Sequence, residues 1–124
     1  MKKAIILLTA LFALIFLAFI SPKNNIIGRW QIVVPDTTKL YVDFNRDGTF
    51  KNFLSDGTVI FDGKYKLNMD TFSIYDKGCG MEYPGKYKLT FSGENSIYFA
   101  VIEDSCKGRR GDINASTLKR VMKK

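Results

Sequence analysis

The chain has 124 residues, a formal net charge of +7 and no histidine, so it has room for one domain and lacks the commonest general base and metal ligand of proteins. Ser–His and Cys–His nucleophile pairs are therefore excluded, and we expect a protein that is not an enzyme and uses no cofactor. Without Lys2 and Lys3 the charge falls to +5, because 17 basic residues then face 12 acidic ones. The lysines alternate with apolar residues instead of forming a patch, and we expect no nucleic-acid partner.

The N-terminus has the pattern of an export signal, with a basic start at 1–3 and an uncharged apolar run of 17 residues at 4–20. Removal and retention both stay open: each candidate cleavage site places Phe or Ile where a signal peptidase prefers a small residue, and the run is at the lower limit for spanning about 30 Å of hydrocarbon. We expect 1–22 to be a signal peptide or membrane anchor, 23–26 a linker and 27–124 the folded domain. The domain would then be secreted, periplasmic or anchored to the outer face of the cytoplasmic membrane, touching a membrane only through its N-terminal segment.

The rest of the chain consists of short runs of alternating apolar and polar residues, separated by turn residues at roughly ten-residue spacing. Strands are expected at 27–34, 40–44, 49–54, 58–67, 71–75, 86–91, 97–102 and 113–121, with Asp62-Gly63 as a turn or as a bulge within one bent strand. We expect a loop at 107–112 and find no helical period beyond the N-terminal segment. Eight strands joined mostly by hairpin-length connections predict an all-β fold, an eight-stranded antiparallel up-and-down (meander) barrel, in which closure removes both sheet edges.

Cys79 and Cys106 bracket two of these strands. Strands joined by a hairpin return to the same end of a sheet, so the loops that carry the two cysteines should be neighbours. In an exported chain without a C-x-x-C motif, this predicts a structural disulfide. Closing that loop would remove about 3.5 kcal/mol of denatured-state entropy. The second of the two strands, 97–102, is apolar on both faces and is expected to be covered on each side.

Five segments carry a likeness to a known family: Gly28-x-Trp30, the hairpin from Phe44 to Phe50 around Asp47-Gly48, Gly63-x-Tyr65-x-Leu67, the segment from Pro84-Gly85-x-Tyr87 to Cys106-x-Gly108-Arg109, and a basic residue in the last strand. With these segments the chain resembles a small bacterial lipocalin-like (calycin-type) domain over about 27–121. The resemblance implies barrel closure by Gly28, Trp30 and Arg120, with the Trp closing the floor and Arg120 packed over it. Lys119, of opposite parity, is the competing residue.

Strand parity places an almost wholly apolar set of side chains inside the barrel: Trp30, Ile32, Val42, Phe44, Phe50, Leu54, Tyr65, Leu67, Phe72, Ile74, Tyr87, Leu89, Phe91, Ile97, Phe99 and Val101. The candidate ligand-lining residues are the aromatic members Phe44, Phe50, Tyr65, Phe72, Tyr87, Phe91 and Phe99. Such a set either fills a barrel or lines a dry pocket, and strands of five or six residues favour a filled or nearly filled interior.

The resemblance implies that the domain binds a small hydrophobic molecule without catalysis, as a monomer. The alternative is a cell-envelope protein-interaction or inhibitor module that uses the barrel as a scaffold and acts through loops such as Gly108-Arg109-Arg110-Gly111.

Two acidic patterns offer chemistry that we do not expect. Asp43-x-Asn45-x-Asp47-Gly48 imitates a calcium loop but has Leu54 where the bidentate Glu belongs, so no metal is predicted. An acid pair could in principle form among four other acidic residues, but all of them lie in or beside loops, and the sequence does not bring two together: Glu82, Glu94, Glu103 and Asp104.

Overall fold

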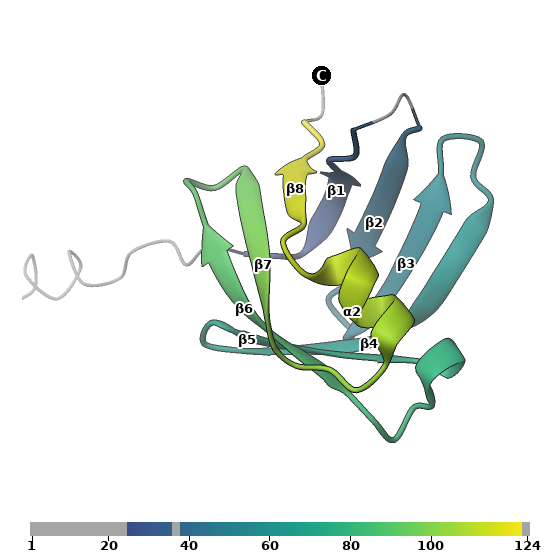
Figure 1. Ribbon diagram of the computed structural model, residues 1–124. Coiled ribbons are helices and arrows are strands. Elements are labelled where there is room, and N and C mark those ends of the chain that lie inside the picture. Colours follow the sequence, from purple (N-terminus) through teal and green to yellow (C-terminus); the bar gives the residue numbers. More distant parts are fainter. Residues whose placement is uncertain (1–24, 36–37, 123–124) are drawn as a thin grey trace, which may run out of the picture.

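The computed structural model describes residues 25–35 and 38–122. Within them eight antiparallel strands pair in chain order and close into a barrel (Figure 1). The strands are β1 (Gly28–Ile32), β2 (Leu40–Phe44), β3 (Thr49–Leu54), β4 (Val59–Asn68), β5 (Thr71–Asp76), β6 (Gly85–Phe91), β7 (Ser96–Glu103) and β8 (Thr117–Arg120). A 3-10 helix, η1 (Lys77–Cys79), follows β5, and an α-helix, α2 (Lys107–Ile113), lies between β7 and β8. The predicted eight-stranded meander barrel is confirmed, and this architecture is consistent with a lipocalin-like fold.

The expected signal or anchor segment, 1–22, lies outside the described residues. In the described part of the chain, no helix combines the length and apolar character that crossing a membrane requires. Ile26, which the expected boundary leaves in the linker, is buried in the core, and its carbonyl accepts a hydrogen bond of 2.7 Å from the Trp30 indole N–H.

Alternating side chains and short polar turns explain most of the strands. In β5, Phe72, Ile74 and Asp76 are buried while their neighbours are less so, which is the period-two pattern of a half-buried strand. The β2–β3 turn is held by the Asp47 carboxylate, which accepts bonds from the Thr49 amide at 3.0 Å and the Thr49 hydroxyl at 2.6 Å. Polar turn chemistry therefore sets the hairpins, and parity sets the buried face.

The expected bend in β4 exists, but at a different position. Residues 59–68 form one strand, and the register with β3 shifts where Asn52 pairs with Phe61 and Phe53 with Val59. Gly63 stays within the ladder, paired with Phe50 on one side and Asp76 on the other. A Cβ at Gly63 would lie 2.1 Å from the Tyr75 carbonyl oxygen, so this glycine permits a close approach of backbones.

The loop predicted at 107–112 is wrong, because α2 occupies this segment and β8 is only four residues long. Two glycines make α2 a poor helix by intrinsic propensity, so contacts made by Arg109, the helix's one buried residue, stabilise it instead. The prediction that both faces of 97–102 are covered is also wrong. Tyr98 and Ile102 are 44% and 56% exposed on the outer face of β7.

The barrel has a closed end and an open end. The closed end holds the β2–β3, β4–β5 and β6–β7 turns, the start of β1 and the end of β8. Trp30 is fully buried there, pairs with Arg120 across the β1–β8 seam, and has the Arg120 guanidinium 4.2 Å from its ring centroid. Gly28, at φ +126°, leaves room for this arginine, since a Cβ there would lie 3.3 Å from the Arg120 Nη1. The expected closure by Gly28, Trp30 and Arg120 is therefore present, and Lys119 pairs with Gln31 instead.

Candidate functional site

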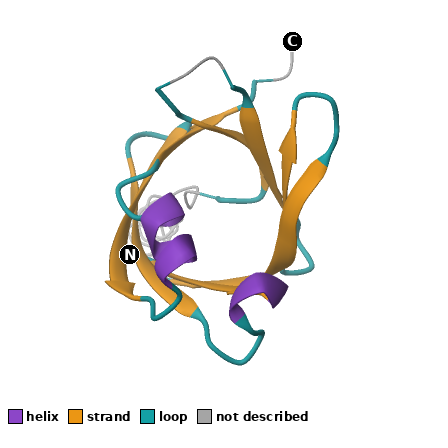
Figure 2. Ribbon diagram, turned by 45° about the vertical axis from the view of Figure 1, so that its right-hand side comes forward, coloured by secondary structure: helices purple, strands orange, loops and turns teal. Residues whose placement is uncertain are grey.

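The open end of the barrel contains a cavity of about 570 Å³. Most of its wall is apolar, and these side chains come from the strands, apart from Val34, which follows β1, and Ile113 of α2. The apolar lining residues are Ile32, Val34, Leu40, Val42, Phe44, Phe50, Ile60, Phe61, Phe72, Ile74, Phe99, Ile113 and Leu118. Figure 2 shows the ring of strands, with both helices at its rim. The expectation of a filled or nearly filled barrel therefore does not describe the open end.

Four of the seven candidate ligand-lining residues lie on the cavity wall: Phe44, Phe50, Phe72 and Phe99. Phe72 is the centre of this set, with edge-to-face contacts at centroid distances of 5.6 Å to Phe44 and 5.2 Å to Phe99. Phe72 and Phe44 also contact the Tyr65 ring, at 5.9 Å and 5.1 Å, on the side of the closed end. These rings therefore form the floor of the cavity.

The other three candidates lie elsewhere. Tyr65 is below the floor, and its hydroxyl donates a 2.6 Å hydrogen bond to the Asn45 carbonyl in the β2–β3 turn. Phe91 is a partly buried residue at the end of β6, packed against the core. Tyr87 is fully buried, and its hydroxyl donates to the Asp104 carboxylate. All three share the inward parity of the lining residues, but parity does not distinguish positions along the barrel axis.

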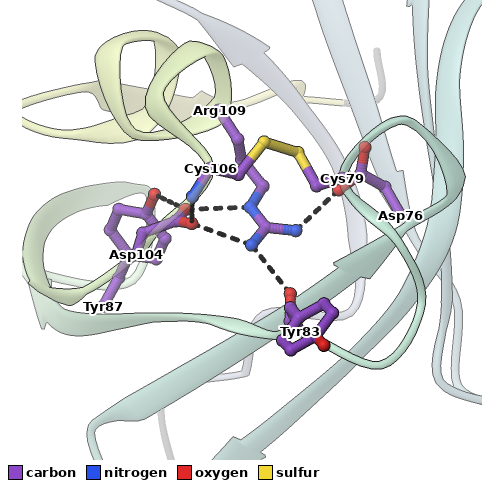
Figure 3. Close-up of a disulfide and its surroundings, with 7 residues drawn as sticks. All are labelled: Asp76, Cys79, Tyr83, Tyr87, Asp104, Cys106 and Arg109. Carbon is purple, nitrogen blue, oxygen red and sulfur yellow. Dashed lines mark hydrogen bonds and ion pairs between the residues drawn. A yellow bond between two sulfur atoms is a disulfide. The ribbon is translucent and has the colours of Figure 1, made fainter.

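A buried arginine, Arg109 of α2, holds one side of the cavity wall together (Figure 3). Its Nε and Nη2 donate to the two oxygens of Asp104, each at 2.8 Å. Its Nη1 donates to Asp76 Oδ1 at 2.7 Å, and Nη2 also donates to the Tyr83 carbonyl at 2.9 Å. One guanidinium thus joins the end of β5, the β5–β6 connection, the segment after β7 and α2.

The ionisation states of this cluster follow from its contacts. The hydrogen bonds to Asp104 and Asp76 outweigh the opposing effect of burial and raise the pKa of Arg109, which therefore stays charged. Burial opposes ionisation of Asp104, but the hydrogen bonds from Arg109, Tyr87 and the Cys106 amide outweigh it and lower the pKa of Asp104. Burial, together with the bond to Asp104, raises the pKa of the Tyr87 hydroxyl, which stays protonated and acts as a donor. These contacts favour the charged forms of Arg109 and Asp104 and the neutral hydroxyl of Tyr87.

The predicted disulfide between Cys79 and Cys106 is present, with the two Cα atoms 5.8 Å apart. It links η1 to the residue that precedes α2, and both cysteines line the cavity. The disulfide and Arg109 therefore tie together the same two segments at the cavity mouth. A disulfide is consistent with a location outside the cytoplasm.

The ionic cluster is the part of the site that our sequence analysis missed. The inward position of Asp76 could have been predicted, because it continues the alternation of Phe72 and Ile74. The predicted strand, however, ends at Tyr75. The sequence places Asp104 only among several acids in or beside loops, and Arg109 in a predicted loop and in one of the segments that carry the family resemblance. Arg109 is 33 residues from Asp76 and 26 residues from Tyr83 in the sequence. At such separations, residue spacing does not predict which side chains are in contact.

The acids of the calcium-like motif have structural roles. Asp43 forms an ion pair of 2.8 Å with Arg29 across β1 and β2, and Asp47 holds the β2–β3 turn. Across residues 25–35 and 38–122, His, Cys, Asp and Glu side chains do not gather in groups of three or more that could hold a metal ion.

The chain matches no family model and no curated protein sequence. The likeness to lipocalin-like domains therefore rests on the barrel itself and on the closure residues Gly28, Trp30 and Arg120. The cavity, its aromatic floor and the ionic cluster come from this chain's own geometry. Any functional conclusion must be drawn from them.

Proposed function

We propose that this protein is an exported, lipocalin-like binding protein that holds a small hydrophobic molecule in the open end of its barrel without catalysis. The observation that carries the proposal is the apolar cavity of about 570 Å³ above the Phe72 floor. Ligand pockets typically have volumes of roughly 300–1,000 Å³ and largely apolar walls with a few polar groups. This cavity has that size and that composition.

The barrel is closed at one end and open at the other, which suits a binding protein with a single entrance. Trp30 and Arg120 close one end, so a ligand must enter where α2, η1 and the β3–β4 turn surround the mouth. A ligand that buries about 300 Å² of apolar surface would gain roughly 7 kcal/mol before the cost of association, which corresponds to weak or moderate affinity. Binding of this kind should depend little on salt, because apolar burial is not screened.

The N-terminal segment bears on where the ligand is exchanged. The first described residue, Asn25, lies at the closed end, where its carbonyl accepts a hydrogen bond from Arg120. We propose that the domain is secreted, periplasmic or held by 1–22 at the outer face of the cytoplasmic membrane. If the segment is retained, the mouth is at the opposite end from the attachment point and takes its ligand from the surroundings. Since every strand is paired on both sides, the barrel has no free edge for sheet-to-sheet dimerisation, and we propose a monomer.

One observation favours the alternative, a cell-envelope interaction or inhibitor module. Val59, Ile60 and Phe61 at the start of β4 are 48%, 41% and 49% exposed, and Tyr83 in the β5–β6 connection is 63% exposed. These side chains belong to the open end and would give a partner protein an apolar surface. The contact loop expected at 108–111 does not supply this surface, because it is part of α2 and its Arg109 is buried.

Saturable uptake of an environment-sensitive hydrophobic dye, followed by competition with lipids, tests the proposal. Leu40→Trp places a larger side chain on the cavity wall and should remove most of the uptake. Tyr98→Trp adds the same side chain on the outer face of β7 and should leave uptake unchanged. If the wild-type protein gives no saturable signal at micromolar concentration, or if both variants bind dye like the wild type, the cavity is not a binding site and the interaction module becomes the better account.

A further inference from the structure

The cavity wall is largely apolar, with two neutral polar residues, Asn52 and Ser116, and a small group of charged residues. Within the described chain, the charged residues that line it are Asp76, Arg109 and Asp112. Asp76 is only 7% exposed and follows Phe72 and Ile74 on the inner face of β5. Its carboxylate is therefore at the same side of the cavity as apolar side chains that a ligand would contact.

A buried arginine on a cavity wall would ordinarily suggest a site for a carboxylate or phosphate. Here Arg109 already donates four hydrogen bonds, three to carboxylate oxygens of Asp104 and Asp76 and one to the Tyr83 carbonyl. A guanidinium has five N–H donors, so at most one remains. An anionic head group would also have to approach two carboxylates that are already in place.

The Asp76 carboxylate, unlike the Arg109 guanidinium, can still accept hydrogen bonds from a ligand. Its Oδ1 accepts from Arg109, whereas Oδ2 accepts no hydrogen bond in the described part of the chain. No fully buried side-chain oxygen or nitrogen among the described residues lacks a partner, so Oδ2 is not sealed by protein. Asp76 is one of the residues that line the cavity, and Figure 3 shows that only one of its two carboxylate oxygens is bonded to Arg109.

The local charge favours a positively charged partner. Asp76 and Asp104 carry two negative charges against the single positive charge of Arg109, and Asp112 adds a third carboxylate to the wall. An excess negative charge in a largely apolar wall is stabilised by a cation or by a hydrogen-bond donor.

We propose that the cavity selects amphiphiles with an apolar chain or ring and a primary ammonium head group, which binds Asp76 Oδ2, and that it discriminates against fatty carboxylates. A hydroxyl head group satisfies the same oxygen by hydrogen bonding and ranks between the two. This inference rests on the proposed binding function and specifies its ligand class. The net charge of the whole chain is +7, which by itself would favour a carboxylate, so the preference must come from the cavity.

The test is a calorimetric titration of the protein with decylamine, decanol and decanoate at neutral pH, below their aggregation concentrations. We expect decylamine to bind about tenfold or more tightly than decanoate, as for a hydrogen bond to a charged group, with decanol between them. In Asp76→Asn, which keeps an acceptor for Arg109, the advantage of decylamine should fall to about twofold, and decanol should change little. Asp70→Asn removes the same charge from the β4–β5 turn at the closed end and should preserve the wild-type order.

The outcomes separate this inference from the proposed function. If none of the three probes binds the wild-type protein, the proposed function fails. If all three bind with equal affinity, or decanoate binds most tightly, the cavity is a binding site but the ammonium preference is wrong. The wild-type comparison decides this even if Asp76→Asn does not fold. An unchanged order of affinities in a folded Asp76→Asn protein would show that Asp76 is not the head-group site.

Discussion

Each end of the barrel is organised by one arginine, and the two arginines do so in opposite ways. Arg120 at the closed end lies over the Trp30 ring and donates to the carbonyls of Glu94, Ile27 and Asn25, without a carboxylate partner in the described chain. Arg109 at the open end is buried between two carboxylates, Asp76 at the end of β5 and Asp104 five residues before it in the chain. Arg120 covers a core that apolar packing already stabilises, whereas Arg109 replaces apolar packing where the barrel is hollow. The open end thus remains ordered while it keeps space for a ligand.

Removing Arg109 should have the largest effect, since it leaves Asp76 and Asp104 as uncompensated buried charges. We expect Arg109→Met to lower the free energy of unfolding by about 3–5 kcal/mol, measured by urea denaturation. Arg110→Met removes the exposed neighbouring charge on the same helix and should stay within about 0.5 kcal/mol of the parent. Equal effects of the two substitutions would mean that the ionic cluster does not stabilise the open end.

The disulfide should come next, because it closes a loop between positions 79 and 106. Replacing both Cys79 and Cys106 with Ser should destabilise the fold by about 2–4 kcal/mol. Hydrogen exchange should then increase first in α2 and η1, while the strands around Trp30 stay protected. An increase that is uniform over the barrel would contradict the view that the two ends are stabilised separately.

At the closed end, Arg120→Met should cost about 1–2 kcal/mol, because the cation–π contact and the bonds to carbonyl oxygens are lost but no buried carboxylate is left unpaired. The environment of Trp30 should change, which its fluorescence would report. Lys119→Met, one residue earlier on the outer parity, should leave both stability and fluorescence close to the parent values. If Arg120→Met lowered the free energy of unfolding as much as Arg109→Met, the two arginines would not stabilise their ends of the barrel in different ways.

The smallest expected effect is that of Tyr87→Phe, at about 1 kcal/mol near neutral pH. The pKa of Asp104 is lowered in the folded state, so its contribution to stability is full well above the unfolded value of about 4 and is lost as the pH falls towards the folded value. Without the Tyr87 hydroxyl the folded pKa of Asp104 should rise, and less stability should then be lost on acidification. Urea titrations at several acidic pH values would measure this, and identical pH profiles would show that the hydroxyl does not stabilise the carboxylate.

The same comparison explains how far the sequence could be interpreted. The closed end follows largely from local patterns: alternation places Trp30 inside and polar turns set the hairpins, whereas Arg120 was favoured by the family resemblance and Lys119 stayed open until the β1–β8 pairing was known. The cysteine pair follows from hairpin geometry. Arg109, by contrast, is in a short glycine-containing helix that bonds to Asp76 and Asp104, and no local period in the sequence predicts such contacts. The sequence left a filled barrel and a dry pocket both open and favoured the filled one, because parity gives which side chains point inward but not how far α2 and the long strand β4 extend the wall beyond the aromatic floor.

The most direct test of the account is native mass spectrometry of the protein purified from its own host, compared with the Leu40→Trp variant prepared in the same way. We predict one non-covalent adduct of small-lipid size on each wild-type chain and its loss from the variant. Bare protein in both samples, together with no saturable uptake of added decylamine or decanol by the wild-type protein, would contradict the claim that the open end is a binding cavity.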